Sequence, residues 1–416
     1  YIESAASGFL AGIEMARRLE GKPPVDFPRE TAIGALGLYI SDTTVSDFQP
    51  MNVNFGIMPP LGYRIKGGKR VKNAQLAIVD AMGGDFAPLA PVKGALMAQE
   101  KYGVDIVLTG KTEEILKALQ QCGCKELPKG MEIANATEVV EICDDPATAF
   151  KHKKDSSLTV GLNMLHAGDA DGFVSAGSTG ALLAGATLVV KRIRGLRRAA
   201  LAPTIPTAKG KAVLIDCGAN AECTVEYLLQ FAYLGSYYAQ KVLGVENPRI
   251  GLLNIGAEES KGDTLRRETY QKLKEAGEAG HLNFTGNIEA KEAMLGECDV
   301  IVADGYSGNI MLKSIEGTGK LLSIKLKDML MHSTGTKLAA LLLKGQLGDF
   351  KKMLDANEVG GTALLGISKP VVKAHGSASE VGICNAVRQA MEVARSGIID
   401  DIAQNIDKMR IEQKAE

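Results

Sequence analysis

Short apolar runs that end in glycine and small polar residues dominate the chain from residue 76 onward. They alternate with stretches of helical periodicity, a pattern typical of a mostly parallel sheet covered by helices on both faces. The sequence therefore predicts an α/β protein with a Rossmann-like three-layer α/β/α sandwich. The strands are expected at 76–79, 104–108, 172–174, 212–215, 250–253, 300–303 and 370–372.

The loops that follow these strands carry most of the polar chemistry of the chain. In open α/β sheets, ligands bind beyond the carboxyl ends of the strands, where several loops converge. Six such loops therefore predict one shared binding site. They are residues 80–85, 175–180, 216–220, 254–261, 304–309 and 375–377.

Two of these loops have the composition of an anion cradle. Glycines between Asp80 and Asp85 let the backbone turn tightly and offer its amide groups to an anion. The loop at 175–180 opens into a helical run, so its amides and the helix N-terminus can hold phosphate. A purely structural turn explains either loop taken singly. Neither loop matches the dinucleotide fingerprint or the phosphate loop of nucleotide-binding proteins, which disfavours both ligand classes.

Three side chains in these loops are candidates for chemistry. Lys261 supplies a cation at a strand exit, although a solvated surface lysine is the common alternative. Asn309 can donate an amide hydrogen bond to a developing oxyanion, and its alternative role is a helix N-cap. His375 can handle a proton or contact phosphate, or serve as a hydrogen-bonded structural histidine.

The composition excludes several classes of protein. The 48 basic and 49 acidic residues give a formal net charge of -1, so no global field attracts nucleic acid. The seven cysteines show no framework spacing, which favours a reducing cytosol, and Cys122 and Cys124 make a poor zinc signal. The longest uncharged apolar stretch, 181–190, is too short to cross a bilayer. No secretory signal is visible, and the start at Tyr1 predicts a fragment or a processed terminus. We expect a cytoplasmic protein without metal or cofactor.

The stretch at 310–356 predicts a long helical hairpin with a break near 332–336. Its second half, residues 337–354, is amphipathic, with leucines at helical spacing and lysines such as Lys337 and Lys344 on the polar side. A basic amphipathic helix can touch a membrane surface or an acidic partner. Packing on the protein core or on a second subunit is the alternative.

With these motifs in view, residues from about 74 to 405 resemble the bacterial acyl-[acyl-carrier-protein]:phosphate acyltransferase family (PlsX) of phospholipid synthesis. The resemblance spans nearly the whole segment, and the number and order of its motifs make it specific. The stretches that carry it are 79–85, 175–182, 198–207, 216–220, 251–256, 304–309 and 373–377.

The resemblance implies transfer of a fatty acyl chain from the thioester of acyl carrier protein to inorganic phosphate. It places the essential lysine at Lys261, expected to hold phosphate, and the essential asparagine at Asn309, expected to steady the thioester carbonyl oxygen. No activated serine or cysteine is needed, because phosphate is itself the nucleophile. The remaining residues expected to bind substrate or phosphate are Asp80, Gly83, Gly84, Asp85, Ser175, Gly177, Ser178, Thr179, Gly180, Asn220, Asn254, Gly308, His375, Gly376 and Ser377.

The resemblance also implies a phosphotransacetylase-like fold, a homodimer formed through the helical region, and peripheral association with the membrane. Residues 337–354 are the expected membrane contact, and the glycerol-3-phosphate acyltransferase that uses the product is an expected partner. One residue departs from the family pattern: Phe86 stands where a histidine is usual, so either that histidine is dispensable or this copy is impaired. The rival hypotheses are a phosphotransacetylase-like enzyme that uses coenzyme A thioesters and a catalytically inactive scaffold.

Residues 1–66 resemble an unrelated protein, the C-terminal end of the folate- and FAD-dependent tRNA (uracil-5-)-methyltransferase. The resemblance rests on residues 1–8, 27–36 and 48–56. The dinucleotide-binding body of that family is absent here, so we expect no FAD binding and a fusion of unrelated segments. A tRNA-binding or flavin-linked module is the rival hypothesis. We expect a partial domain at 1–66 with helices at 4–20 and 29–39, a basic linker at 67–73 and an acyltransferase domain at 74–416.

Overall fold

The computed structural model describes Arg17, Leu19 and residues 75–411 except 142 and 147. The chain divides into two compact units, Tyr1–Gln75 and Leu76–Glu416. The predicted segment at 1–66 and the linker at 67–73 lie outside the described residues, apart from Arg17 and Leu19. The fold is therefore that of the second unit.

A seven-stranded sheet forms the first half of this unit, in the order β3-β2-β1-β4-β12-β11-β5. The first five strands in this order are parallel, whereas β11 runs antiparallel to both of its neighbours. The parallel strands place their carboxyl ends at one edge of the sheet. The strands are β1 (Leu76–Asp80), β2 (Asp105–Gly110), β3 (Met131–Asn135), β4 (Gly172–Ser175), β5 (Ala200–Ala202), β11 (Gly361–Leu365) and β12 (Val371–Ala374).

A five-stranded sheet follows, in the order β6-β7-β10-β8-β9, with only β6 antiparallel to its neighbour. The predicted mostly parallel arrangement is confirmed, but the strands belong to two sheets. Each of the seven predicted runs overlaps a strand, whereas β3, β5, β6, β9 and β11 were not predicted. The strands of the second sheet are β6 (Thr204–Thr207), β7 (Gly210–Ile215), β8 (Arg249–Leu253), β9 (Asn283–Ile288) and β10 (Val300–Val302).

Helices cover both faces of the first sheet. Helices α3, α4 and α15 pack on one face, and α6, α7 and η1 pack on the other. Gly94 of α3 permits the close approach of α15, since a Cβ atom there would lie 2.6 Å from the Cβ of Ile383. The helices are α3 (Leu89–Tyr102), α4 (Thr112–Gln121), α5 (Ala149–His152), α6 (Ser157–Ala167), α7 (Thr179–Gly185), the π-helical η1 (Ala186–Lys191) and α15 (Glu380–Ser396).

The second sheet has α8 and α9 on one face, with α16 and η2 packed beside α8. Its other face shares a core with the first sheet, where Phe173 and Leu201 cluster with Leu214 and Ile301. Because this core joins the two sheets, the strand ends of both are held in a fixed relation. The helices are α8 (Val225–Lys241), α9 (Thr264–Glu278), α10 (Ala290–Met294), α16 (Ile398–Gln404) and η2 (Ile406–Met409).

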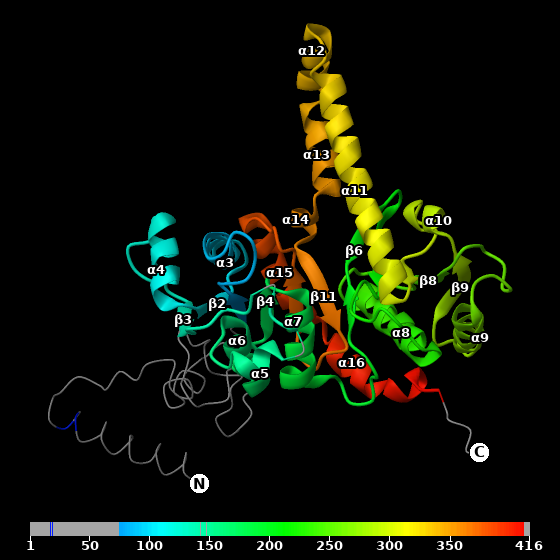
Figure 1. Cartoon of the computed structure of the whole chain (residues 1–416), viewed down its shortest axis with the longest axis horizontal. Coiled ribbons are helices and arrows are strands. Elements are labelled where there is room, and N and C mark those ends of the chain that lie inside the picture. The colour runs from blue at the N-terminus through cyan, green and yellow to red at the C-terminus, as the bar shows by residue number, and fades with distance from the viewer. Residues whose placement is uncertain (1–16, 18, 20–74, 142, 147, 412–416) are drawn as a thin grey trace. The chain divides into compact units, whose positions relative to one another are not determined.

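A helical hairpin extends from the sheets, as Figure 1 shows. Its helices are α11 (Gly305–Leu330), α12 (Thr334–Leu342), α13 (Lys344–Leu354) and the short α14 (Ala356–Val359). The predicted break near 332–336 is confirmed, but residues 337–354 form parts of two helices that meet at Leu343. Many apolar side chains here are exposed, including Leu341 at 66% and Leu342 at 80%. In the described part of the chain, no helix has the length and apolarity to cross a membrane.

Candidate active site

A pocket of about 440 Å3 lies where strand ends of the two sheets meet. We call it the polar pocket. Thr179 and Gly376 line it from the first sheet, following β4 and β12, and Gly218 and Asn309 line it from the second, following β7 and β10. Four of the six predicted loops therefore reach one pocket.

The loop at 80–85 does not line the polar pocket but contacts two of the loops that do. The Ser175 hydroxyl donates a hydrogen bond of 2.7 Å to the carboxyl group of Asp80, and the Asp85 amide donates one of 2.8 Å to the carbonyl oxygen of Gly376. Burial raises the pKa of Asp80 above the ordinary range of an aspartate. Gly83 is required by close packing, because a Cβ atom there would lie 2.7 Å from the Asp80 carboxyl group. These residues, predicted as binding residues, here hold the strand ends together.

Some backbone amides in and next to the loop at 175–180 are hydrogen-bonded within the protein. The amide of Gly177 donates to the Ser175 hydroxyl at 3.0 Å, and the Ser178 hydroxyl caps α7 by accepting from the amide of Ala181. These two amides are therefore occupied within the protein rather than offered to an anion. Gly180 packs against Pro146, and Thr179 is the residue of this loop that lines the polar pocket.

A buried carboxyl group organises the loop after β7. Asp216 accepts backbone hydrogen bonds from Leu201 at 2.9 Å and from Asn220 at 2.7 Å, and burial raises its pKa. The Asn220 side chain donates to the carbonyl oxygen of Ala199 at 2.8 Å. Asn220 therefore fixes the loop, while Gly218 faces the pocket.

The first turn of α11 positions Asn309. Asp304 is the N-cap of this helix and accepts from the Ser307 amide at 2.9 Å, so the alternative of Asn309 as an N-cap is wrong. Gly308 lets the helix begin against the neighbouring loop, since a Cβ atom there would lie 2.0 Å from the Asp216 carbonyl oxygen. Asn309 is exposed, lines the polar pocket and faces Gly218. Its side-chain amide forms no hydrogen bond with a residue that the structure describes, so it can meet a ligand oxygen in the pocket.

The loop after β12 brings two further groups to the polar pocket. The Nδ1 atom of His375 lies 2.9 Å from the Ser377 hydroxyl and accepts from the Ser377 amide at 3.2 Å. Ser377 thus orients the imidazole, and the ring remains exposed on the pocket.

Lys373, at the end of β12, also lines the polar pocket, although the sequence reasoning did not select it. It is only 8% exposed, and burial lowers the pKa of its ammonium group to about 8. A lysine within an otherwise apolar strand was the signal that could have identified it.

A second cavity of about 1120 Å3 adjoins the polar pocket. We call it the apolar cavity. The two share Pro206, Ile315, Gly319 and Met353 as lining residues. About half of the other lining side chains are apolar, among them Leu253, Ile255, Met294, Ile310, Met311 and Leu322. The combined space suits a ligand with a long apolar part and a small polar group.

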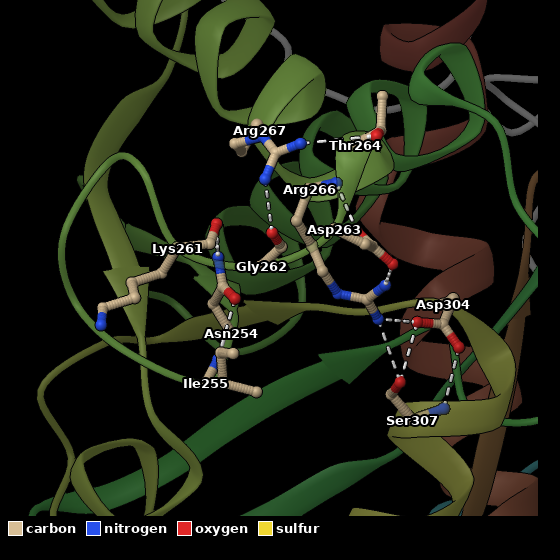
Figure 2. A network of polar contacts seen from close by, with 10 residues as sticks. All are labelled: Asn254, Ile255, Lys261, Gly262, Asp263, Thr264, Arg266, Arg267, Asp304 and Ser307. Atoms are coloured by element: carbon tan, nitrogen blue, oxygen red, sulfur yellow. Dashed lines mark hydrogen bonds and ion pairs between the residues drawn. The ribbon is translucent and has the colours of Figure 1, made fainter.

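A polar network lies at one side of the apolar cavity (Figure 2). The guanidinium group of Arg266 contacts the Asp304 carboxylate, the Ser307 hydroxyl at 3.1 Å and the Asp263 carboxylate at 2.7 Å. The predicted residue Asn254 lines this cavity and accepts from the Ile255 amide at 2.8 Å. Arg266 was not predicted; its position near the start of α9 was the available signal.

Lys261 lies apart from both cavities. Its backbone carbonyl accepts from the Asn254 side chain at 3.2 Å, and its side chain is exposed. Figure 2 shows the ammonium group directed away from Arg266 and Asp304. The role of Lys261 in holding phosphate remains a prediction, because Lys261 lines neither cavity.

Phe86 likewise lines neither cavity and is 56% exposed. The histidine that the family pattern places here would therefore stand outside the polar pocket.

The thiols and potential metal ligands offer no competing centre in the part of the chain that the structure describes. Cys217 lines the polar pocket, but burial raises the pKa of its thiol to about 12, so the nucleophilic thiolate is not populated near neutral pH. Residues 75–411, as far as they are described, hold no group of three or more histidine, cysteine or acidic side chains arranged for a metal ion.

Comparisons with known proteins agree with this geometry. The family described as "Fatty acid synthesis protein" matches residues 75–401. A protein named "Phosphate acyltransferase" from Thermoanaerobacterium thermosaccharolyticum is 44% identical over 329 residues, covering 79% of this chain and 96% of its own length. One of the same name from Thermoanaerobacter pseudethanolicus is 45% identical over 332 residues, covering 80% of this chain and 97% of its own.

Among solved structures, a phosphotransacetylase from Streptococcus pyogenes superposes with a TM-score of 0.53 at 18% identity, covering 77% of this chain and 95% of that one. This likeness confirms the predicted phosphotransacetylase-like fold. The family match begins at residue 75, so it leaves the N-terminal segment at 1–66 outside. By the extent of the family match and the identity to its relatives, the chain belongs to the fatty acid synthesis protein family of phosphate acyltransferases.

Proposed function

We propose that this protein transfers a fatty acyl group from the thioester of acyl carrier protein to inorganic phosphate and forms an acyl phosphate. The observation that carries the proposal is the polar pocket opening beside the apolar cavity, with lining residues in common. The apolar cavity accommodates the acyl chain, and the polar pocket accommodates phosphate and the reacting carbonyl group.

The reaction is a single displacement at the thioester carbonyl carbon. A phosphate oxygen forms the new C–O bond, the C–S bond breaks, and the thiol of the carrier leaves after taking up a proton. Asn309 donates its side-chain amide to the carbonyl oxygen, where negative charge develops. The protein mainly positions two reactants, so it needs no covalent intermediate.

The donor thioester separates this proposal from its nearest rival, a phosphotransacetylase-like use of acyl coenzyme A. The size of the apolar cavity favours a long acyl chain. The name of the family also refers to fatty acid synthesis, in which chains are carried on acyl carrier protein.

The test mixes the purified chain with long-chain acyl carrier protein and inorganic phosphate. Hydroxylamine traps the acyl phosphate as a hydroxamate, and a thiol reagent counts the released carrier. We expect phosphate-dependent hydroxamate with acyl carrier protein and much less with acyl coenzyme A. Equal rates with the two donors would favour the rival, and no product from a folded protein would favour the inactive scaffold.

The exposed apolar side chains of the hairpin support two further proposals. We propose that α11, α12 and α13 mediate a homodimer, which light scattering during gel filtration can test. We also propose peripheral membrane contact through residues 337–354, whose lysines can accompany Leu338 and Leu341 onto anionic vesicles. Such contact would bring the product close to a glycerol-3-phosphate acyltransferase in the membrane.

We propose that the N-terminal segment at 1–66 does not bind flavin, although it resembles part of a tRNA methyltransferase. Residues 1–66 do not contain the dinucleotide fingerprint G-x-G-x-x-G. A flavin absorption spectrum that persisted through gel filtration would contradict this.

A further inference from the structure

We propose that the Lys373 ammonium group binds the phosphate co-substrate in the polar pocket. This assignment rests on the proposed function and adds a cation to the site that the resemblance did not supply. Lys373 is the second-last residue of β12 and pairs in register with Ser175 at the end of β4. It lines the polar pocket together with Thr179 and His375.

The first argument is that Lys373 is buried without an ionic partner. An ammonium group withdrawn from water is costly unless a counter-charge compensates it. Lys373 forms no ion pair with any residue in the described part of the chain; its contacts are the carbonyl oxygens of Ala176, at 3.3 Å, and Ala374. The carboxyl groups of Asp80 and Asp85 attract the ammonium group. Neither forms an ion pair with it among the described residues, and Asp80 accepts the hydrogen bond of the Ser175 hydroxyl. An anion in the pocket would compensate the charge.

The second argument concerns the hydrogen atoms of the ammonium group. A protonated lysine has three N–H donors. Two are directed to the carbonyl oxygens of Ala176 and Ala374, and the third has no acceptor among the residues that the structure describes. Since Lys373 lines the polar pocket, a ligand oxygen can accept the third hydrogen bond.

The third argument is the contrast with the other lysine of the polar pocket. Lys313 pairs with Glu316 at 2.7 Å, and its side chain is 54% exposed. Its charge is therefore largely satisfied by a neighbour and by water. Lys373 is buried and has no ion-pair partner among the described residues. An anion should therefore bind more favourably at Lys373 than at Lys313. A small, multiply charged oxyanion such as phosphate matches a lone ammonium better than a neutral carbonyl group does.

The test measures phosphate binding directly, without an acyl donor. Equilibrium dialysis with radiolabelled inorganic phosphate is applied to the full chain and to three variants. Lys373→Met keeps the length of the side chain but removes its charge, and we expect at least a tenfold loss of affinity. Lys373→Arg keeps the charge and should retain more affinity than Lys373→Met. Lys313→Met, at the same pocket, is the comparison: because Lys313 is exposed and paired with Glu316, its loss should lower the affinity less than Lys373→Met does.

Steady-state kinetics add a second readout. In Lys373→Met, the KM for phosphate should rise at least tenfold while the KM for the acyl donor stays unchanged. Phosphate binding that is unchanged in Lys373→Met, or lost equally in Lys313→Met, would overturn the assignment. Circular dichroism verifies that the variants are folded, and the affinity of Lys373→Arg relative to Lys373→Met separates loss of charge from loss of packing. If wild type binds phosphate through Lys373 but transfers no acyl group, the proposed function fails while this assignment stands.

Discussion

The guanidinium group of Arg266 pairs with the carboxylate of Asp304, the residue that caps α11. Both side chains are largely shielded, with exposures of 18% and 9%. Because α11 also carries Asn309, the pair links the start of α9 to the helix that presents the candidate oxyanion donor. A charged contact outside the polar pocket thus helps to set the geometry within it.

Replacing Arg266 with methionine should destabilise the protein, because Asp304 would remain buried without its partner. Loss of one member of a shielded ion pair typically costs about 3 kcal/mol. Urea unfolding measures this difference in the free energy of unfolding. The matched control is Arg267→Met, since Arg267 is exposed and, among the residues described, its side chain bonds to Gly262 and Thr264 alone. Equal stability of the two variants would show that the pair contributes little.

Asn309→Ala should lower kcat about 10²- to 10³-fold, the usual effect of removing one oxyanion donor. Asn309 is exposed, so the melting temperature should change little. The control is Tyr306→Ala on the same helix, where a side chain that is 64% exposed lines neither cavity. Turnover of Asn309→Ala at the wild-type level would remove the asparagine from the mechanism.

Lys261→Ala tests whether this lysine takes part in the reaction although it lines neither cavity. The resemblance makes this lysine essential, yet its ammonium group lies outside both cavities. We therefore expect the variant to lose most of its turnover while retaining wild-type stability. Full activity of Lys261→Ala would instead identify it as a solvated surface lysine.

The strand ends were predictable because their signal is local. A buried strand requires a short apolar run, and the loop after it requires residues that favour turns. Both signals can therefore be recognised from adjacent residues in the sequence. The runs at 172–174 and 250–253 fall on β4 and β8 for this reason. Strand β9 was missed because Asn283–Ile288 contains polar residues and glycine, and its pairing with β8 is a tertiary effect.

The assignment of side chains to the pocket was less predictable. Gly177 and Asn220 have residue types suited to anion binding, but in the fold their hydrogen bonds are satisfied within the protein. Conversely, Lys373 and Arg266 acquire their environment only when distant segments meet. These long-range contacts determine whether a polar group is hydrogen-bonded within the protein or can bind a ligand.

Phe86→His should change turnover less than twofold. The side chain is 56% exposed and lines neither cavity, so an imidazole there reaches neither the carbonyl group nor phosphate. The hydroxamate assay measures the effect, with Phe86→Ala as the control for loss of the ring. A large gain restricted to the histidine variant would establish that this copy is impaired at Phe86.

The buried charge of Lys373 should also appear in the pH dependence of stability. Burial lowers its pKa from 10.5 to about 8, with Lys313 adding a repulsion and with Asp80 and Asp85 partly opposing the shift. Between these two values the unfolded chain binds a proton that the folded chain has released. Stability due to this group therefore rises with pH from about 8 to 10.5 and is lowest at neutral pH.

Lys373→Met lacks this titration, so wild type should gain stability relative to the variant as the pH rises through that interval. This change in the pKa of Lys373 corresponds to an increase of about 3 kcal/mol in the free energy of unfolding. Urea unfolding in phosphate-free buffer at several pH values measures the difference, and Lys313→Met should show no comparable trend. Adding phosphate at pH 7 should stabilise wild type more than Lys373→Met, because the anion compensates the buried ammonium group only where one is present. A flat difference across the pH range would mean that the ammonium group is well solvated.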